Sequence, residues 1–158
     1  MEVAGPELVL LIGLQASGKS TFYRERLAAT HVHISKDLLA KNKNTHARQQ
    51  RLLKEALSQN KRVALDNTNP SAGLRAEQIA LAKSFNARCV GYYFESKMSA
   101  CLARNSQRVG ASRVPDVALF ATSKMLALPR YEEGFDGLFY VRLSEGGFSV
   151  FEWDSSLA

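Results

Sequence analysis

The sequence contains no apolar run close to the roughly 20 residues that a membrane-spanning helix requires. Its two cysteines, Cys89 and Cys101, have neither C-x-x-C nor metal-ligand spacing, so we expect two small core residues and no disulfide framework or metal centre. No basic and apolar leader opens the chain, and no repeat or low-complexity tract interrupts it. These absences predict a single domain, residues 1–158, in the cytoplasm.

The composition adds little about function. Hydrophobic residues make up 46% and charged residues 23%, which is typical of a soluble globular protein. The net charge of +6 has two explanations, a polyanionic partner or the lysines and arginines that a triphosphate-binding enzyme collects. The three histidines form no metal cluster and no Ser-His-Asp arrangement; His31 and His33 are expected on one face of a strand and His46 at the start of a helix.

Apolar strand-like runs alternate with amphipathic helical stretches. This alternation predicts an α/β fold with a mostly parallel five-stranded sheet flanked by helices on both faces. In the last helix, Val117, Ala121, Met125 and Leu128 recur at helical spacing and are expected in the core. The strands are predicted at 8–13, 31–35, 62–66, 88–94 and 138–143, with a possible edge strand at 148–153, and the helices at 19–29, 45–59, 71–85, 97–107 and 115–127.

Residues 13–20 match the phosphate-binding pattern G-x-x-x-x-G-K-[ST] between a predicted strand and a predicted helix. In that context, backbone N–H groups of the loop and the helix N-terminus surround a phosphate. Lys19 would reach the β- and γ-phosphates and Ser20 would hold Mg²⁺, so ATP and Mg²⁺ are the expected cofactors. A glycine-rich turn without function is the alternative. The expected nucleotide-binding residues are Gly13, Gln15, Ala16, Ser17, Gly18, Lys19, Ser20 and Thr21.

Two acidic residues follow the second and third predicted strands, on the edge where the phosphates would lie. Asp37 is the candidate general base for an acceptor hydroxyl, although it could also cap a helix that starts at Leu38. Asp66 takes the place of a Mg²⁺-associated acid and could order metal-bound water or bind an arginine. Its neighbours Asn67 and Thr68 are candidate acceptor contacts or simply turn formers.

Three arginines surround a glycine-containing joint after the fourth predicted strand. Arg104 and Arg108 are four residues apart on a probable helix face, and Arg113 follows Gly110. Such a segment suits a lid that closes over a triphosphate and neutralises the transferring charge. A solvated basic helix end is the alternative.

Three longer segments, 31–37, 61–70 and 132–137, resemble the kinase domain of polynucleotide kinases of the polynucleotide kinase/3′-phosphatase type. The resemblance implies that Asp37 is the general base, that Asp66, Asn67 and Thr68 help to build the acceptor side, and that Arg104 and Arg108 are lid residues that contact phosphates. The chain departs from the family at Gln15-Ala16-Ser17, where a proline- and glycine-containing stretch is usual, and at Leu38, where no arginine flanks the base. The phosphatase motif D-x-D-x-T is absent, which predicts a stand-alone kinase module.

The predicted function is therefore ATP-dependent phosphoryl transfer to the 5′-hydroxyl of a DNA or RNA strand, without a membrane or an obligate protein partner. Two alternatives stay open: a small-molecule or toxin-like kinase, and a nucleotide-binding ATPase without a phosphorylated acceptor. For a polynucleotide, the candidate phosphate contacts are Lys36, Lys41, Lys43, Arg48 and Arg75. The guanine-selecting sequence N-K-x-D is absent, and the sequence does not separate ATP from GTP.

Overall fold

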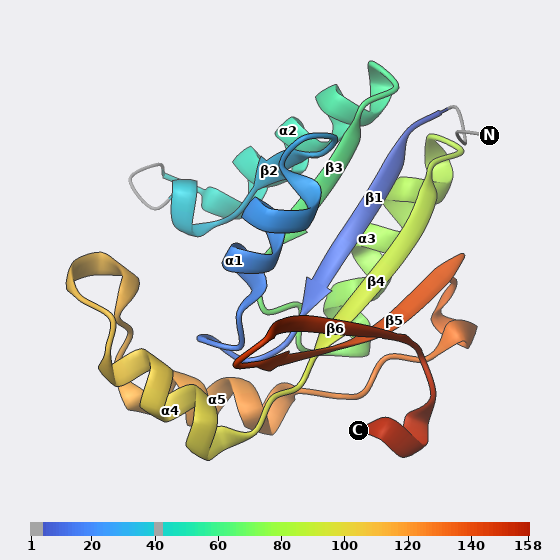
Figure 1. Cartoon of the computed structure of the whole chain (residues 1–158). Helices are drawn as coiled ribbons and strands as arrows, with labels where there is room; N and C mark the ends of the chain where they lie inside the picture. The colour runs from blue at the N-terminus through green and yellow to red at the C-terminus, as the bar shows by residue number, and fades with distance from the viewer. Residues whose placement is uncertain (1–4, 40–42) are drawn as a thin grey trace.

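One six-stranded sheet runs through the protein, whose computed structural model describes residues 5–39 and 43–158. The strand order is β2-β3-β1-β4-β5-β6, in which the first five strands are parallel and β6 pairs antiparallel with β5 (Figure 1). The strands are β1 (Glu7–Ile12), β2 (Val32–Ile34), β3 (Arg62–Asp66), β4 (Arg88–Phe94), β5 (Gly137–Ser144) and β6 (Gly147–Glu152).

Helices connect the parallel strands, as the alternating pattern predicted. α1 passes without a break into a π-helical segment, Tyr23–Leu27, so only the first part of the predicted helix 19–29 is α-helical. Such π turns occur often beside functional sites. The α-helices are α1 (Lys19–Phe22), α2 (Thr45–Ser58), α3 (Ala72–Ser84), α4 (Met98–Ser106) and α5 (Asp116–Met125).

Successive residues of β1 face opposite sides of the sheet, and each side has its own core. Leu8, Leu10 and Ile12 pack in a cluster with apolar residues of α2 and α3. Val9 and Leu11 pack instead with Phe22, Tyr23 and Leu27 from α1 and the π-helical segment. Because β1 is covered on both faces, it is a continuous apolar run, and the predicted placement of helices on both faces is confirmed.

Two predictions about the C-terminal half need correction. The sheet has six strands, since the possible edge strand at 148–153 is a full partner of β5. The stripe on α5 is not core: Val117, Ala121, Met125 and Leu128 are exposed, and Leu119 is the buried residue of this helix. Helical spacing identifies one face of a helix but does not say whether another element covers it. The cysteines are buried and free, as predicted.

The carboxyl ends of the strands gather the predicted functional segments at one edge. β1 leads into the phosphate-binding loop, residues 13–20; β2 leads into a 3₁₀ helix, Asp37–Leu39; and β3 leads into residues 66–70. After β4, the chain forms α4 and α5 with the connection between them, and we call this hairpin (residues 98–125) the lid. The lid lies beyond the end of the sheet, beside the phosphate-binding loop (Figure 1). Within the described residues, no helix is both long and apolar enough to cross a bilayer.

Candidate active site

The phosphate-binding loop joins β1 to α1, as its sequence context predicted. At Gly13, a Cβ atom would lie 3.1 Å from the hydroxyl oxygen of Ser96, with φ at +152°. At Gly18, where φ is +102°, a Cβ atom would lie 3.1 Å from the ring of Phe148. The folded loop therefore requires glycine at both positions, whether or not a phosphate is bound, because a side chain would be strained and crowded there.

Lys19 is buried, and its ammonium group points back at the loop. Nζ donates to the carbonyl oxygens of Gly13 at 2.9 Å and Leu14 at 2.6 Å, and it lies 3.4 Å from the hydroxyl of Ser17. Burial lowers the pKa of Lys19 to about 8, against the opposing effect of the Asp66 carboxylate. The ammonium group of Lys19 is thus hydrogen-bonded to neutral backbone carbonyls. A phosphate, which is an anion, would bind this ammonium group more strongly than the carbonyls do.

Ser20 and Asp66 meet across the sheet edge. The Ser20 hydroxyl donates to Oδ2 of Asp66 at 2.7 Å, and Nε2 of His33 lies 2.8 Å from the same oxygen. Burial acts to raise the pKa of Asp66, but the hydrogen bonds from His33 and Ser20, together with the charge of Lys19, hold this pKa below its ordinary value. The carboxylate is therefore ionised at neutral pH and adjoins the loop.

This pair of oxygens fits the expected Mg²⁺. In nucleotide-binding sites Mg²⁺ takes few protein oxygens and completes its shell with phosphates and waters. The Ser20 hydroxyl and the buried Asp66 carboxylate supply such a set at the mouth of the loop. Among residues 5–39 and 43–158, no three His, Cys, Asp or Glu side chains are grouped to hold a metal without such additional ligands.

Asp37 lies in a loop that is tied to the end of β3. The backbone N–H of Lys36 donates to Oδ1 of Asn67 at 2.9 Å, and Nδ2 of Asn67 donates to Gln49 of α2 at 2.8 Å. The Asp37 carboxylate is on an exposed residue, and it lies near enough to Lys19 to contribute to its pKa. Asn67 thus positions the Asp37 loop.

Asp37 was also expected as the cap of a helix that starts at Leu38, but it is the first residue of the helix. The 3₁₀ helix begins at Asp37 itself, not at Leu38, and the Ser35 hydroxyl accepts a hydrogen bond from the Asp37 N–H at 3.1 Å. Ser35 is the capping side chain, which leaves the Asp37 carboxylate available for other chemistry.

The residues after Asp66 hold the loop in place from the other side. The backbone N–H of Gly13 donates to the carbonyl of Thr68 at 3.0 Å. Nδ2 of Asn69 donates to the carbonyl of Leu11 at 2.7 Å. The segment after β3 is therefore fastened to both β1 and the phosphate-binding loop.

The position of Arg75 does not fit its predicted role as an acceptor contact. It is completely buried, and its guanidinium pairs with Glu133 at 2.8 Å and 3.2 Å and donates to the carbonyls of Asn69 and Pro70. A buried arginine needs all its donors satisfied, and these partners occupy it. Arg75 instead supports the backbone of the segment that follows Asp66. Another candidate, Lys41, lies outside the described residues.

The lid arginines Arg104 and Arg108 lie near the phosphate-binding loop, and one prediction about them needs correction. Nη1 of Arg104 donates to the carbonyl of Ala16 at 2.9 Å. Arg108 is close enough to Lys19 to lower its pKa, while its own Nη1 donates to the carbonyl of Ser112 at 3.2 Å. α4 ends at Ser106, so Arg108 lies beyond the helix and does not share a helix face with Arg104.

Two further loop residues make contacts of their own. Nε2 of Gln15 donates to the hydroxyl of Thr122 on α5 at 2.9 Å, and the Thr21 hydroxyl accepts from Arg24 at 3.2 Å. Three residues that contact the site in the structure were not predicted to be part of it: His33, Gln49 and Thr122. The position of His33 in a strand beside the one that ends in Asp66 could have indicated that His33 contacts this carboxylate.

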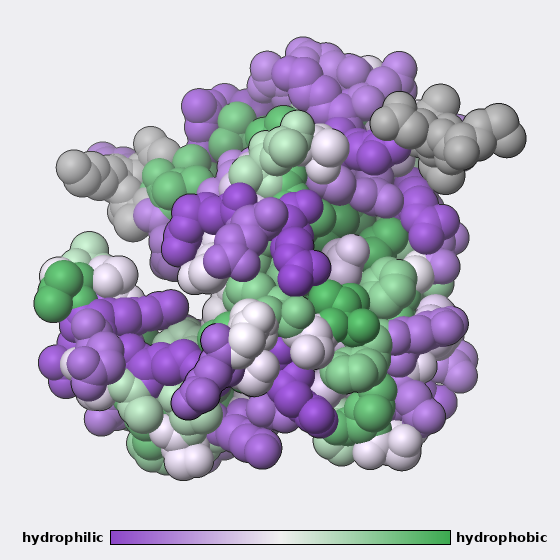
Figure 2. Space-filling model, viewed as in Figure 1, coloured by the Kyte–Doolittle hydropathy of each residue, from purple (hydrophilic) through white to green (hydrophobic). Residues whose placement is uncertain are grey.

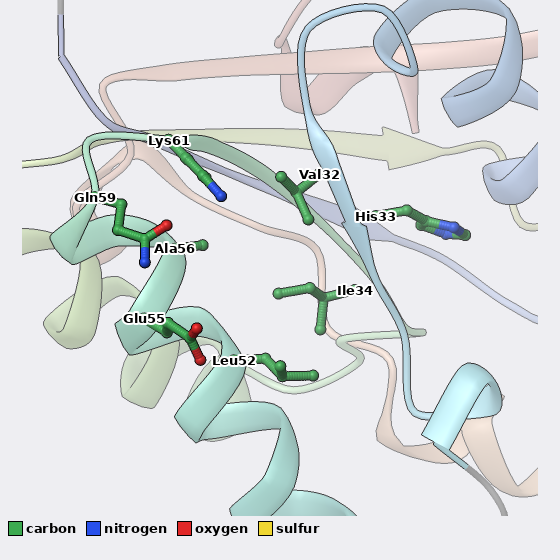
Figure 3. A pocket seen from close by; sticks show the side chains of 8 residues that line it. All are labelled: Val32, His33, Ile34, Leu52, Glu55, Ala56, Gln59 and Lys61. Atoms are coloured by element: carbon green, nitrogen blue, oxygen red, sulfur yellow. The ribbon is translucent and has the colours of Figure 1, made fainter.

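A cleft separates the lid from the part of the molecule that carries the 3₁₀ helix Asp37–Leu39 (Figure 2). Its visible surface is mainly hydrophilic (Figure 2). A separate pocket of about 250 Å³ lies between β2 and α2, where Val32, Ile34, Leu52 and Ala56 form its apolar lining (Figure 3). In that view His33 points away from the other lining residues, so this pocket is distinct from the Asp66 contact.

Comparison with known proteins agrees with this geometry. A sequence model described as an AAA domain matches residues 8–129. The chain belongs to this AAA domain family. Its phosphate-binding loop, strand order and lid also make it a P-loop NTPase fold, as predicted.

Two curated relatives carry more specific names. A proposed bifunctional polynucleotide phosphatase/kinase of Acanthamoeba polyphaga mimivirus is 32% identical over 138 residues, and the bifunctional polynucleotide phosphatase/kinase of Schizosaccharomyces pombe is 28% identical over 135 residues. Each match covers 82% of this chain but only 32% of the relative. The predicted resemblance to polynucleotide kinases of the polynucleotide kinase/3′-phosphatase type is thereby confirmed as a similarity, and the chain spans about a third of the length of these relatives.

Solved structures of several other proteins have the same fold. A fungal RNA kinase aligns with a TM-score of 0.68 and 13% identity over 89% of this chain and 39% of the other. A gluconokinase from Sinorhizobium meliloti aligns with a TM-score of 0.65 and 18% identity over 90% of this chain and 86% of the other. At these identities the likeness concerns the fold alone.

Proposed function

We propose that this protein transfers the γ-phosphoryl group of ATP to the 5′-hydroxyl of a DNA or RNA strand. The carrying observation is the shared sheet edge at which Lys19, the Ser20–Asp66 pair and Asp37 meet. A phosphate site, a pair of metal-binding oxygens and a separate exposed carboxylate are the parts that phosphoryl transfer to an alcohol needs. The names of the two curated relatives support a polynucleotide as the acceptor.

Each of these residues has a distinct part in the proposed reaction. Lys19 leaves the loop carbonyls to bind the β- and γ-phosphates. Ser20 and Asp66 would hold Mg²⁺, which would neutralise charge on the phosphate oxygens. Asp37 accepts the proton of the acceptor hydroxyl, whose oxygen bonds to the γ-phosphorus as the bond to the β–γ bridging oxygen breaks and ADP leaves.

The lid completes the charge balance. Arg104 reaches the loop at the carbonyl of Ala16, and Arg108 lies near Lys19, so both can bind the phosphoryl group during transfer. Because these contacts strengthen as charge builds on the equatorial oxygens, they favour the transition state over bound ATP.

Exposed cations near Asp37 support a polynucleotide acceptor. Lys36 precedes the base, and Lys43 and Arg48 are exposed residues before and within the first turns of α2. A strand whose 5′-hydroxyl lies at Asp37 carries its next phosphates within reach of such side chains, and these contacts are independent of base sequence.

A small-molecule kinase is the second candidate, because the fold also aligns with a gluconokinase. The experiment that separates the two uses γ-labelled ATP, Mg²⁺, and either 5′-hydroxyl oligonucleotides of DNA and RNA or a panel of sugars and sugar acids. Label on the oligonucleotide supports the proposal, and the same oligonucleotide with a 5′-phosphate is the matched control. Label on a small alcohol alone, or release of free phosphate alone, overturns it.

A further inference from the structure

Three successive residues of the phosphate-binding loop contact the lid by three different interactions. The buried side chain of Leu14 packs with Cys101 of α4 and Leu119 of α5. The amide of Gln15 is hydrogen-bonded to Thr122 of α5 at 2.9 Å. The carbonyl of Ala16 accepts a hydrogen bond from Arg104 of α4 at 2.9 Å. The loop and both lid helices therefore form one packed unit.

The Gln15 side chain is only half satisfied in this arrangement. Its Nε2 is bonded to Thr122, whereas its Oε1 is buried and has no partner among the described residues. A threonine hydroxyl both donates and accepts, so turning the amide around leaves the other polar end unpaired instead. An unpaired polar group in the protein interior costs free energy, so the buried Oε1 of Gln15 destabilises this arrangement of loop and lid. The Gln15–Thr122 hydrogen bond therefore depends on the packing around it.

The same short segment holds the contacts that nucleotide binding must exchange. In this structure the carbonyls of Gly13 and Leu14 accept from Lys19, and that of Ala16 accepts from Arg104. Under the proposed function both cations turn to phosphates, and these carbonyls lose their donors. Gln15 lies between the two exchanged contacts, and its side chain is hydrogen-bonded to Thr122 of α5.

We infer that Gln15 and Thr122 are positioning residues, which couple the conformation of the phosphate-binding loop to the position of the lid. This inference rests on the proposed phosphoryl transfer. When phosphates reshape the loop, the Gln15–Thr122 hydrogen bond carries the change to α5, and the lid presents Arg104 to the transferring group. The coupled element is the packed unit of loop and lid helices, and the two side chains bias its arrangement.

A double-mutant cycle tests the inference. Thr122→Val removes the hydroxyl and keeps the shape, Gln15→Met removes the amide and keeps the length, and the double variant combines them. We expect each single variant to slow single-turnover transfer by about 3- to 30-fold, while the dissociation constant for ATP changes by less than about threefold. Transfer by the double variant should be no slower than transfer by the slower single variant, because the two substitutions remove the same Gln15–Thr122 hydrogen bond.

Two controls separate positioning from general damage. Thr122→Ser restores the hydroxyl and should recover most of the rate lost in Thr122→Val. Ser123→Ala changes the adjacent exposed residue of α5 and should leave the rate unchanged. Additive losses in the cycle, or no recovery with serine, would overturn the inference.

A second readout does not depend on the acceptor. ADP should protect the backbone amides of α4 and α5 from hydrogen exchange in the wild type, and Thr122→Val should reduce this protection. If the wild type phosphorylates no acceptor, the proposed function fails, and the exchange experiment still decides the coupling. Equal protection in wild type and Thr122→Val contradicts the coupling whichever acceptor is used.

Discussion

The Ser20 hydroxyl donates a 2.7 Å hydrogen bond to the Asp66 carboxylate, across 46 residues of sequence. The contact joins the end of the phosphate-binding loop to the end of β3. His33 binds the same carboxylate oxygen from the end of β2 at 2.8 Å, and its ring stacks on Tyr23 with centroids 4.1 Å apart. The start of α1 and the ends of β2 and β3 are thereby fixed around one buried, ionised carboxylate.

Asp66→Asn should retain the fold and lose Mg²⁺-dependent transfer. The amide oxygen can still accept from Ser20 and His33, but it lacks the charge that holds a divalent cation. Loss of one such electrostatic contact lowers turnover on the order of 100- to 1000-fold. Turnover measured over a wide range of Mg²⁺ concentration checks this. Glu152→Gln, an exposed carboxylate on β6, is the control, and a variant as active as the wild type at low Mg²⁺ contradicts the assignment.

Asp37→Asn should abolish transfer while ATP affinity stays within a few-fold of wild type. The asparagine keeps the shape of the side chain but cannot accept the hydroxyl proton at neutral pH. Calorimetric ATP binding and single-turnover transfer should be measured on the same preparation. Since Asp37 is exposed and its loop is capped by Ser35, the melting temperature should hardly change. Persistent transfer with weakened ATP binding would move Asp37 to a metal-binding or structural role.

The loop, the strand ends and the lid could be predicted from sequence because each depends on local patterns. Residues 13–20 carry their own motif, and Asp37 and Asp66 directly follow apolar strands whose carboxyl ends must share an edge. The alternation of runs was sufficient to predict the parallel sheet. These features need no knowledge of which side chains meet.

What could not be predicted depends on contacts between distant segments. Arg75 looks like a surface cation in a helix, and only the position of Glu133 makes it a buried structural residue. The apolar stripe that contains Val117 and Met125 has the right period for a core face, yet α5 is so placed that it stays exposed. His33 acquires importance only because Asp66 lies opposite.

The buried charge of Lys19 should make stability depend on pH in the absence of nucleotide. Its pKa is about 8 in the folded protein against an ordinary value of 10.5, so between these values the unfolded chain binds more protons. The free energy of unfolding should therefore rise with pH across this window. Urea unfolding of wild type and Lys19→Met at several pH values isolates the effect as their difference. A constant difference would mean that Lys19 is not buried as a cation.

Arg104→Ala and Arg108→Ala should each slow transfer more than they weaken ATP binding. A lid contact to the phosphoryl group grows in strength as charge builds during transfer. Single-turnover rates and ATP dissociation constants give the two quantities for each variant. Lys124→Ala is the matched control, because this exposed cation in the last turn of α5 belongs to the same lid and has no predicted role in phosphate binding. Equal losses in rate and in affinity would make the arginines ground-state ligands.

If the acceptor is a polynucleotide, its binding affinity should depend on the length of the strand and on the salt concentration. Each contact between a single strand and a cation releases counterions and contributes about −0.7 to the slope of log affinity against log salt concentration. Affinity for 5′-hydroxyl oligonucleotides should therefore rise with length until the cations around Asp37 are occupied. A small alcohol carries no backbone phosphates and should show no such dependence.

Single substitutions identify which cations make these contacts. Lys36→Ala, Lys43→Ala and Arg48→Ala should each weaken oligonucleotide binding and make the salt slope shallower by about 0.7, while ATP affinity is kept. Lys54→Ala, an exposed cation further along α2, should leave the slope unchanged if the strand follows the first turns of that helix. Arg75 makes an unsuitable probe, because its removal would leave the half-buried Glu133 without its ion-pair partner. Binding that ignores both length and salt, together with no 5′-phosphorylated product, would leave the small-molecule kinase as the better assignment.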